Sequence, residues 1–184
     1  MSIHPTDQED AYFRKQDQEL REKLRAQLSE AATDLGNSKK DTLSIAQRIQ
    51  ALGFSGARLR VFDLMPLIHI AWADGSVSRQ ERAAILDILK GRGLEHGSEP
   101  YLLIETLLEV RPSEQFLSES LDVLRLVVGD ARAESIVELC LQVANASGGF
   151  MNVGNVSPEE RAQLAAIADK LGPAARDAFH RELG

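Results

Sequence analysis

The first part of the chain carries a narrow stripe of apolar residues at helical spacing. Between residues 7 and 33 they recur at intervals of seven, four, four and three positions, and most of the residues between them are charged or Gln. Such a thin stripe is typical of a helix that lies across a domain surface or pairs with a second copy. We therefore predict an N-terminal charged helical arm over residues 1–37, whose stripe consists of Phe13, Leu20, Leu24, Leu28 and Ala31.

We predict one helical domain over residues 38–184. Its first long apolar stretch, residues 57–73, is hydrophobic on nearly every side, as a helix buried in a core would be. Pro66 lacks an N–H for the helix ladder, so we expect a kink or restart between Phe62 and Pro66, with Asp63 as a candidate cap. Amphipathic helices follow, separated by Gly, Pro and Ser, and no segment alternates with a period of two. The predicted fold is all-α, with roughly eight or nine helices.

A short motif occurs twice at a constant offset of 79 residues. Val77–Ala83 matches Val156–Ala162, and each copy places a Ser before a helix and a Glu three residues later. This is the pattern of a capping box, in which the two side chains bind the free amides at a helix start. The motifs at 74–82 and 153–161 predict two pseudo-symmetric helical units, although convergent capping signals would give the same match.

One of these motifs resembles a known family. The segment that carries the resemblance is Ala71-Trp72-Ala73-Asp74-Gly75-Ser76-Val77-Ser78-Arg79-Gln80-Glu81. It is similar to the signature of the tellurite-resistance TerB family and to the corresponding module of DjlA-type co-chaperones. The resemblance covers roughly residues 57–183 in helix order and is sharp only over residues 71–81. It implies paired three-helix units, a cytoplasmic setting, no enzymatic reaction, and an acidic site for a divalent metal at Asp74 and Glu81.

The second copy of the motif departs from the family pattern. The position that corresponds to the aspartate is Val153 in an ungapped alignment, and it is Ser147 if residues 149–154 are an insertion. A second, symmetric metal site is therefore not expected. Whether Glu160 keeps a role as a ligand stays open.

The residues themselves permit two interpretations of Asp74 and Glu81. The turn at Gly75 can bring the carboxylates together, and a hard cation such as Ca²⁺ or Mg²⁺ would relieve their repulsion. Against this, a capping box explains Glu81 completely, and Asp74 can bind its own backbone. The sequence thus predicts either a divalent-cation site or a metal-free structural domain for protein–protein interaction.

Composition narrows the classes of partner. Lys and Arg number 21 against 28 Asp and Glu, so the formal net charge is −7, which disfavours binding to nucleic acid. The single cysteine, Cys140, excludes an intrachain disulfide and a four-cysteine zinc site. The longest apolar stretch is shorter than the ~20 residues that cross a bilayer, so we expect no membrane insertion. We expect a cytoplasmic module with a protein partner, and the arm offers a route to a homodimer.

The remaining candidate residues point away from catalysis. His69 lies on the most apolar helix and is expected to be a core histidine, and Cys140 is expected to be a buried, inert thiol. No nucleophile elbow, phosphate-binding loop or dinucleotide fingerprint occurs. An enzyme built on an acidic cluster is the weakest interpretation, so we predict no catalytic residues and no organic cofactor.

Overall fold

The computed structural model describes residues 18–27, 44–147 and 156–184. These residues contain helices and no strand, which confirms the all-α prediction. Residues 18–27 are helical, and the later part has eight α-helices and one 3-10 helix. In chain order they are α2 (Ile45–Ala51), η2 (Gly56–Leu64), α3 (Met65–Ala71), α4 (Arg79–Gly91), α5 (Glu99–Glu109), α6 (Glu114–Val127), α7 (Asp130–Ser147), α8 (Pro158–Leu171) and α9 (Pro173–Leu183).

Serine side chains fix where several helices begin. In each case the Ser hydroxyl accepts a hydrogen bond from a backbone amide in the first turn, which would otherwise lack a partner. The two capping boxes predicted from the repeated motif are both present, at the starts of α4 and α8. The capping serines are Ser44 for α2, Ser78 for α4, Ser113 for α6 and Ser157 for α8.

The apolar stretch of residues 57–73 forms two elements instead of one helix. The 3-10 helix η2 ends at Leu64, and α3 begins at Met65 with Pro66 in its first turn, so the predicted restart is confirmed. The candidate cap at Asp63 is wrong, since α3 has no side-chain cap. The Asp63 carboxylate instead accepts hydrogen bonds from Arg92, at 2.8 Å, and from Arg132. Asp63 thus pairs with two arginines that are distant in the sequence and does not cap α3.

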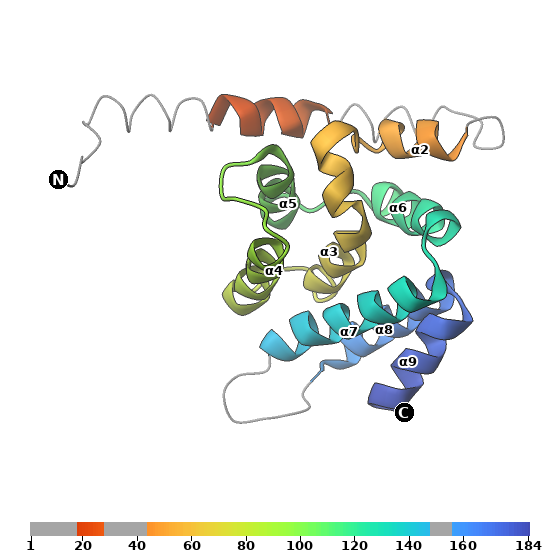
Figure 1. The fold of residues 1–184 in the computed structure, drawn as a ribbon. Coiled ribbons are helices and arrows are strands. Elements are labelled where there is room, and N and C mark those ends of the chain that lie inside the picture. The colour runs from red at the N-terminus through yellow and green to blue at the C-terminus, as the bar shows by residue number, and fades with distance from the viewer. Residues whose placement is uncertain (1–17, 28–43, 148–155) are drawn as a thin grey trace.

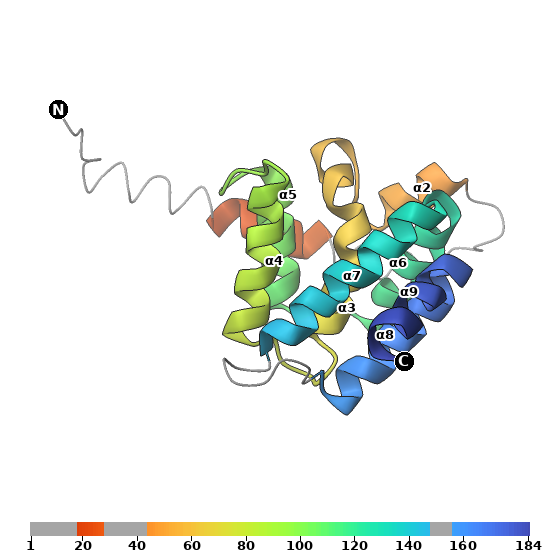
Figure 2. The ribbon, with the colours of Figure 1, turned by 60° about the horizontal axis from the view of Figure 1, so that its bottom comes forward.

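Helix α7 is the centre of the packing. It contacts α3, α4, α8 and α9, and Figures 1 and 2 show it crossing the other helices of the domain. Every residue of α3 is buried, so this helix forms the middle of the hydrophobic core. The two units that carry the repeated motif, α3–α4 and α7–α8, therefore pack directly against each other.

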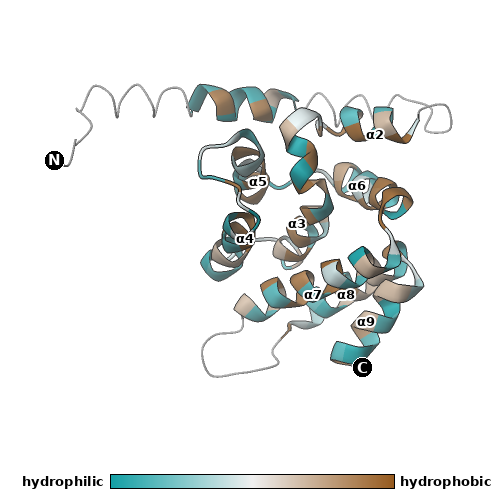
Figure 3. Cartoon of the chain, viewed as in Figure 1, coloured by the Kyte–Doolittle hydropathy of each residue, from teal (hydrophilic) through white to brown (hydrophobic). Residues whose placement is uncertain are grey.

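The helices at the surface are amphipathic, and Figure 3 shows apolar and polar residues on the same helix in α4, α6 and α7. None of the helices in the described parts of the chain is long and apolar enough to cross a bilayer.

Residues 18–27 cross α5 on the outside of the domain, as Figures 1 and 2 both show. Leu24 is buried, and two arginines of this segment pair with glutamates of α5. The arm is predicted to lie across the domain surface or to pair with a second copy, and these ten residues lie on the domain surface. The rest of the predicted helix, and the division of the chain at residues 37 and 38, lie outside the described residues.

Candidate metal centre

The loop between α3 and α4 presents Asp74 at the surface. Trp72 closes α3, and its indole Nε1 donates a hydrogen bond to the carbonyl oxygen of Leu107 in α5, at 2.9 Å. Gly75 adopts a φ of 94°, which favours glycine and turns the chain toward α4. The Asp74 side chain is exposed, and its Oδ1 accepts a hydrogen bond from the backbone amide of Ser76 at 3.1 Å. Asp74 thus stabilises the turn that positions it.

Glu81 lies one turn into α4 and is almost completely buried, with 3% of its surface exposed. Its Oε2 accepts a hydrogen bond from the backbone amide of Ser78 at 2.8 Å. In return, the Ser78 hydroxyl accepts from the backbone amide of Glu81 at 3.2 Å. The predicted capping box is therefore confirmed as one role of Glu81.

The second copy of the motif has the same local geometry at the start of α8. Glu160 Oε2 accepts from the backbone amide of Ser157 at 2.7 Å, and the Ser157 hydroxyl accepts from the Glu160 amide at 3.1 Å. Glu160 is as buried as Glu81, with 4% of its surface exposed. The structure thus holds two buried glutamates at equivalent places in the two units.

Asp74, Glu81 and Glu160, which we call the acidic corner, interact electrostatically. The pKa of Glu81 is raised, chiefly because burial penalises its charged form. The hydrogen bonds from Ser78 oppose this effect, while the negative charges of Glu160 and then of Asp74 raise the pKa further. The fold therefore brings three acidic side chains close enough to disfavour the charge on Glu81.

The donor set of the corner is small for a metal site. Among the described residues, no group of three or more His, Cys, Asp and Glu side chains has the arrangement of a metal site. Carboxylate oxygens suit Ca²⁺ and Mg²⁺, but Ca²⁺ takes ~6–8 oxygens, so backbone carbonyls and water would have to complete its shell. Of the two possible counterparts of Asp74 in the second unit, Val153 lies outside the described residues and Ser147 is the last residue of α7.

Proximity between Glu81 and Glu160 was the feature that motif analysis missed. The motif predicts each glutamate as a cap, but a local pattern does not predict which helix starts lie close together in the fold. The repeat was the available signal, because equivalent positions in two packed units often lie near their shared axis. Glu160 consequently belongs to the electrostatic environment of the predicted site.

His69 and Cys140 have the structural roles expected of them. His69 Nε2 lies 2.8 Å from the carbonyl oxygen of Leu117, and Nδ1 lies 3.3 Å from Nε2 of Gln163. Burial lowers the pKa of His69 to about 4, although the Leu117 carbonyl opposes the shift. Cys140 is fully buried, and this burial raises the pKa of its thiol. Both side chains are therefore held in uncharged forms at neutral pH.

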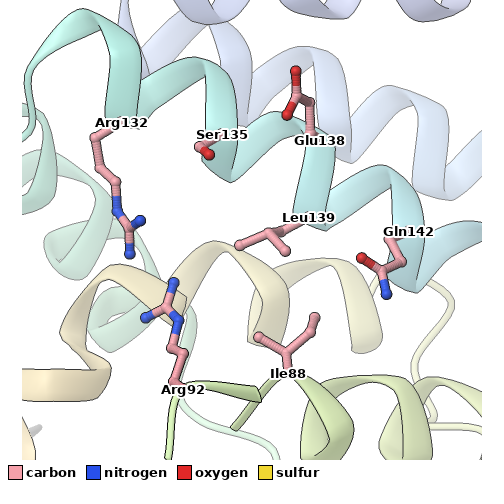
Figure 4. Close-up of a pocket in the computed structure, with 7 residues that line it drawn as sticks. All are labelled: Ile88, Arg92, Arg132, Ser135, Glu138, Leu139 and Gln142. Atoms are coloured by element: carbon pink, nitrogen blue, oxygen red, sulfur yellow. The ribbon is translucent and has the colours of Figure 1, made fainter.

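A groove of about 410 Å³ lies between α4 and α7. Figure 4 shows Ile88 and Leu139 facing each other across it, with Arg92 and Arg132, which we call the arginine pair, at one end. Asp63 accepts hydrogen bonds from both arginines. Glu138 also lines the groove, and Arg181 lies 3.9 Å from its Oε1.

Comparison with known proteins agrees with the motif at the α3–α4 loop. The family model for tellurite resistance protein TerB matches residues 63–181, well over half of the chain. The matched region contains α3, the acidic corner and both capping boxes. A search of curated proteins and a search of solved structures each found no match. The chain belongs to the TerB family, as the residues from Ala71 to Glu81 predicted.

Proposed function

We propose that the acidic corner binds a divalent cation, Ca²⁺ or Mg²⁺, through the carboxylates of Asp74 and Glu81. The observation that carries this proposal is the raised pKa of Glu81, a buried carboxyl beside the charges of Glu160 and Asp74. A doubly charged cation would offset the repulsion among these groups, and carboxylate oxygens are the ligands such hard cations prefer. Glu160 would act through its charge on the ion or on Glu81.

In this proposal the chain is a non-enzymatic TerB-like module that acts in the cytoplasm. It would serve a tellurite-type stress response through a protein partner, and the ion would set the shape or charge of the corner that the partner meets. Family membership supports the module and its link to tellurite resistance. The uncharged states of the buried His69 and Cys140 side chains support a role other than catalysis.

A metal-free interaction domain is the alternative, and specific hydrogen bonds favour it. Glu81 is engaged by the amide of Ser78, and Asp74 is engaged by the amide of Ser76. Both contacts are ordinary structural uses of a carboxylate at a helix start and in a turn. In this alternative the acidic corner only shapes the junction of α3 with α4.

Titration calorimetry of the full chain with CaCl₂, MgCl₂ and ZnCl₂ separates the two functions. We expect one of the hard cations to bind with a dissociation constant below the millimolar range, and Asp74→Ala to abolish this binding. Asp87→Ala is the matched control, because Asp87 is an exposed acid of α4 that pairs with Lys90. Affinity should fall as the pH is lowered, since protons and cations compete for Glu81. No binding tighter than millimolar in the wild type would leave only the metal-free alternative.

A further inference from the structure

One face of α5 is covered by residues 18–27. Leu102, Glu105 and Glu109 follow one another at spacings of three and four residues, which places them on one side of the helix. Leu102 is completely buried, yet it stands outside the main hydrophobic cluster of the described residues. Figures 1 and 2 show the segment 18–27 crossing α5. This segment therefore shields a face that the core does not use.

Two arginines of the covering segment pair with this face, and the leucine between them in the sequence is buried. Arg21 binds Glu105 Oε2 through Nη2 at 2.8 Å and Glu109 Oε1 through Nη1 at 2.9 Å. Arg25 binds Glu109 Oε2 at 3.1 Å. Leu24 is buried, with 1% of its surface exposed. Positions 21, 24 and 25 form one stripe of a helix. The face of α5 thus pairs with two arginines of a helical stripe whose leucine is buried.

The contact between residues 18–27 and α5 is of a kind that another helix can replace. Within residues 18–27, Leu24 is the buried side chain, and Arg21 and Arg25, whose side chains are part-exposed, form the ion pairs with α5. Gln27 Oε1 also accepts a hydrogen bond from Arg58 Nη1 of η2 at 3.1 Å. Part-exposed ion pairs are individually weak, and a helix this short is marginal in isolation. Arg82 of α4 lies 3.5 Å from Glu105 and 3.3 Å from Glu109. The two glutamates therefore keep a cationic neighbour when the segment leaves.

We propose that this face of α5 is a docking surface for a basic amphipathic helix of a partner protein, which residues 18–27 occupy until that helix displaces them. The proposal goes beyond the cation site and does not rest on it. A partner is favoured over a second copy because the tethered segment has an effective concentration on the order of millimolar. An identical helix from another copy would lose this competition, whereas a partner helix with more contacts would win it.

Fluorescence anisotropy with a labelled peptide of residues 7–33 tests the surface in the full-length protein. Arg21→Glu sets a carboxylate against Glu105 and Glu109 and should release the tethered segment. We expect the peptide to bind Arg21→Glu at least about tenfold more tightly than the wild type, because 90% occupancy by the tethered segment lowers apparent affinity tenfold. Lys23→Glu makes the same charge change at an exposed position of the segment and should match the wild type.

Peptide variants test the chemistry of recognition. A peptide with the Arg21→Glu change should lose binding, and a helix of unrelated sequence that keeps only Arg21, Leu24 and Arg25 should retain it. The proposal is overturned if no peptide binds Arg21→Glu, if all three proteins bind equally, or if charge reversal in the peptide has no effect. A wild-type dimer that Arg21→Glu converts to a monomer in sedimentation would make the occupant a second copy and also overturn it.

Two further measurements keep the result interpretable. If circular dichroism shows that Arg21→Glu is unfolded, Arg25→Glu replaces it, because it removes only the contact with Glu109. Cation titration of the same variant keeps the two proposals apart, since Asp74 and Glu81 are unchanged. Cation binding without peptide binding refutes the docking surface alone, and peptide binding without cation binding refutes the metal site alone.

Discussion

Replacement of His69 by Gln should flatten the dependence of folding stability on pH. His69 is buried in α3, where the neutral imidazole can donate to the Leu117 carbonyl and accept from the Gln163 amide. Glutamine can repeat both hydrogen bonds through its amide nitrogen and oxygen, but it cannot take up a proton. The variant therefore removes the titration while it retains the polar contacts of the site.

The size of the effect follows from the pKa of His69. Burial lowers this pKa from 6.5 to about 4, with the positive charge of Lys170 as a lesser contribution in the same direction. The Leu117 carbonyl and the charge of Glu114 act in the opposite direction. Between these two pH values the unfolded chain binds a proton that the folded chain does not. This contribution to stability is fully present above pH 6.5, is lost as the pH falls toward 4, and amounts to about 3 kcal/mol.

Urea unfolding at several pH values, followed by the fluorescence of the single Trp72, measures this contribution. Between pH 7 and pH 5 we expect the free energy of unfolding of the wild type to fall by about 2 kcal/mol more than that of His69→Gln. His180→Gln controls for the loss of a surface histidine. Parallel curves for the wild type and His69→Gln would refute the argument that burial keeps this imidazole neutral.

Three other substitutions test the site and its supports by urea unfolding. Glu81→Gln keeps an acceptor for the Ser78 amide without the disfavoured charge, so it should be at least as stable as the wild type at pH 7, whereas Glu81→Ala should cost about 1 kcal/mol. Because the pKa of Glu81 is raised, the greater stability of Glu81→Gln should appear at pH values above the ordinary pKa of a carboxyl group and vanish in acid. Greater stability of the variant that persists in acid would contradict this reasoning. Gly75→Ala forces an L-residue to a φ of 94° and should lower the free energy of unfolding by about 1–2 kcal/mol. Gly91→Ala, in α4 with free space at its Cβ, is the control and should be neutral or stabilising. Equal effects of the two substitutions would show that the turn does not require glycine. Asp63→Asn removes the carboxylate shared by the arginine pair. It should lower the free energy of unfolding by about 1 kcal/mol at low salt and by less at high salt. A loss of stability that does not depend on salt would exclude an effect of charge.

The parts of the fold that depend on local chemistry were predictable from the sequence. Ser78 and Ser157 satisfy amides within their own first turns, so four consecutive residues determine the helix start. Pro66 enforces a restart for an equally local reason, since it lacks a donor and fixes its own φ. The start of a helix is therefore predictable wherever the residues that determine it lie within one turn.

Features that depend on distant partners were not predictable in the same way. Asp63 has the right position for a cap, but Arg92 and Arg132 compete for its carboxylate from 29 and 69 residues away. The segment 57–64 forms a 3-10 helix although its composition also suits an α-helix. The motif likewise identified Asp74 and Glu81, but only the packing of the two units brings the charge of Glu160 to Glu81. Tertiary contacts determine the partner of Asp63, the type of the helix before α3 and the charge near Glu81. These contacts cannot be predicted from the local pattern of a single sequence.

The structural and ligand roles of Glu81 do not exclude each other, because a carboxylate has two oxygens. The backbone hydrogen bonds to the acidic corner engage Oε2 of Glu81 and Oδ1 of Asp74, and Oε2 of Glu160 in the second unit. In the proposed site, the second oxygen of each of the Asp74 and Glu81 carboxylates would coordinate the cation while the first maintains the cap or the turn. Glu81→Gln separates the roles, since it preserves the cap and removes the anionic ligand. If this variant folds as well as the wild type and binds Ca²⁺ or Mg²⁺ equally well, Glu81 is a cap alone; if folding is kept and binding is lost, the buried charge is retained for the ion.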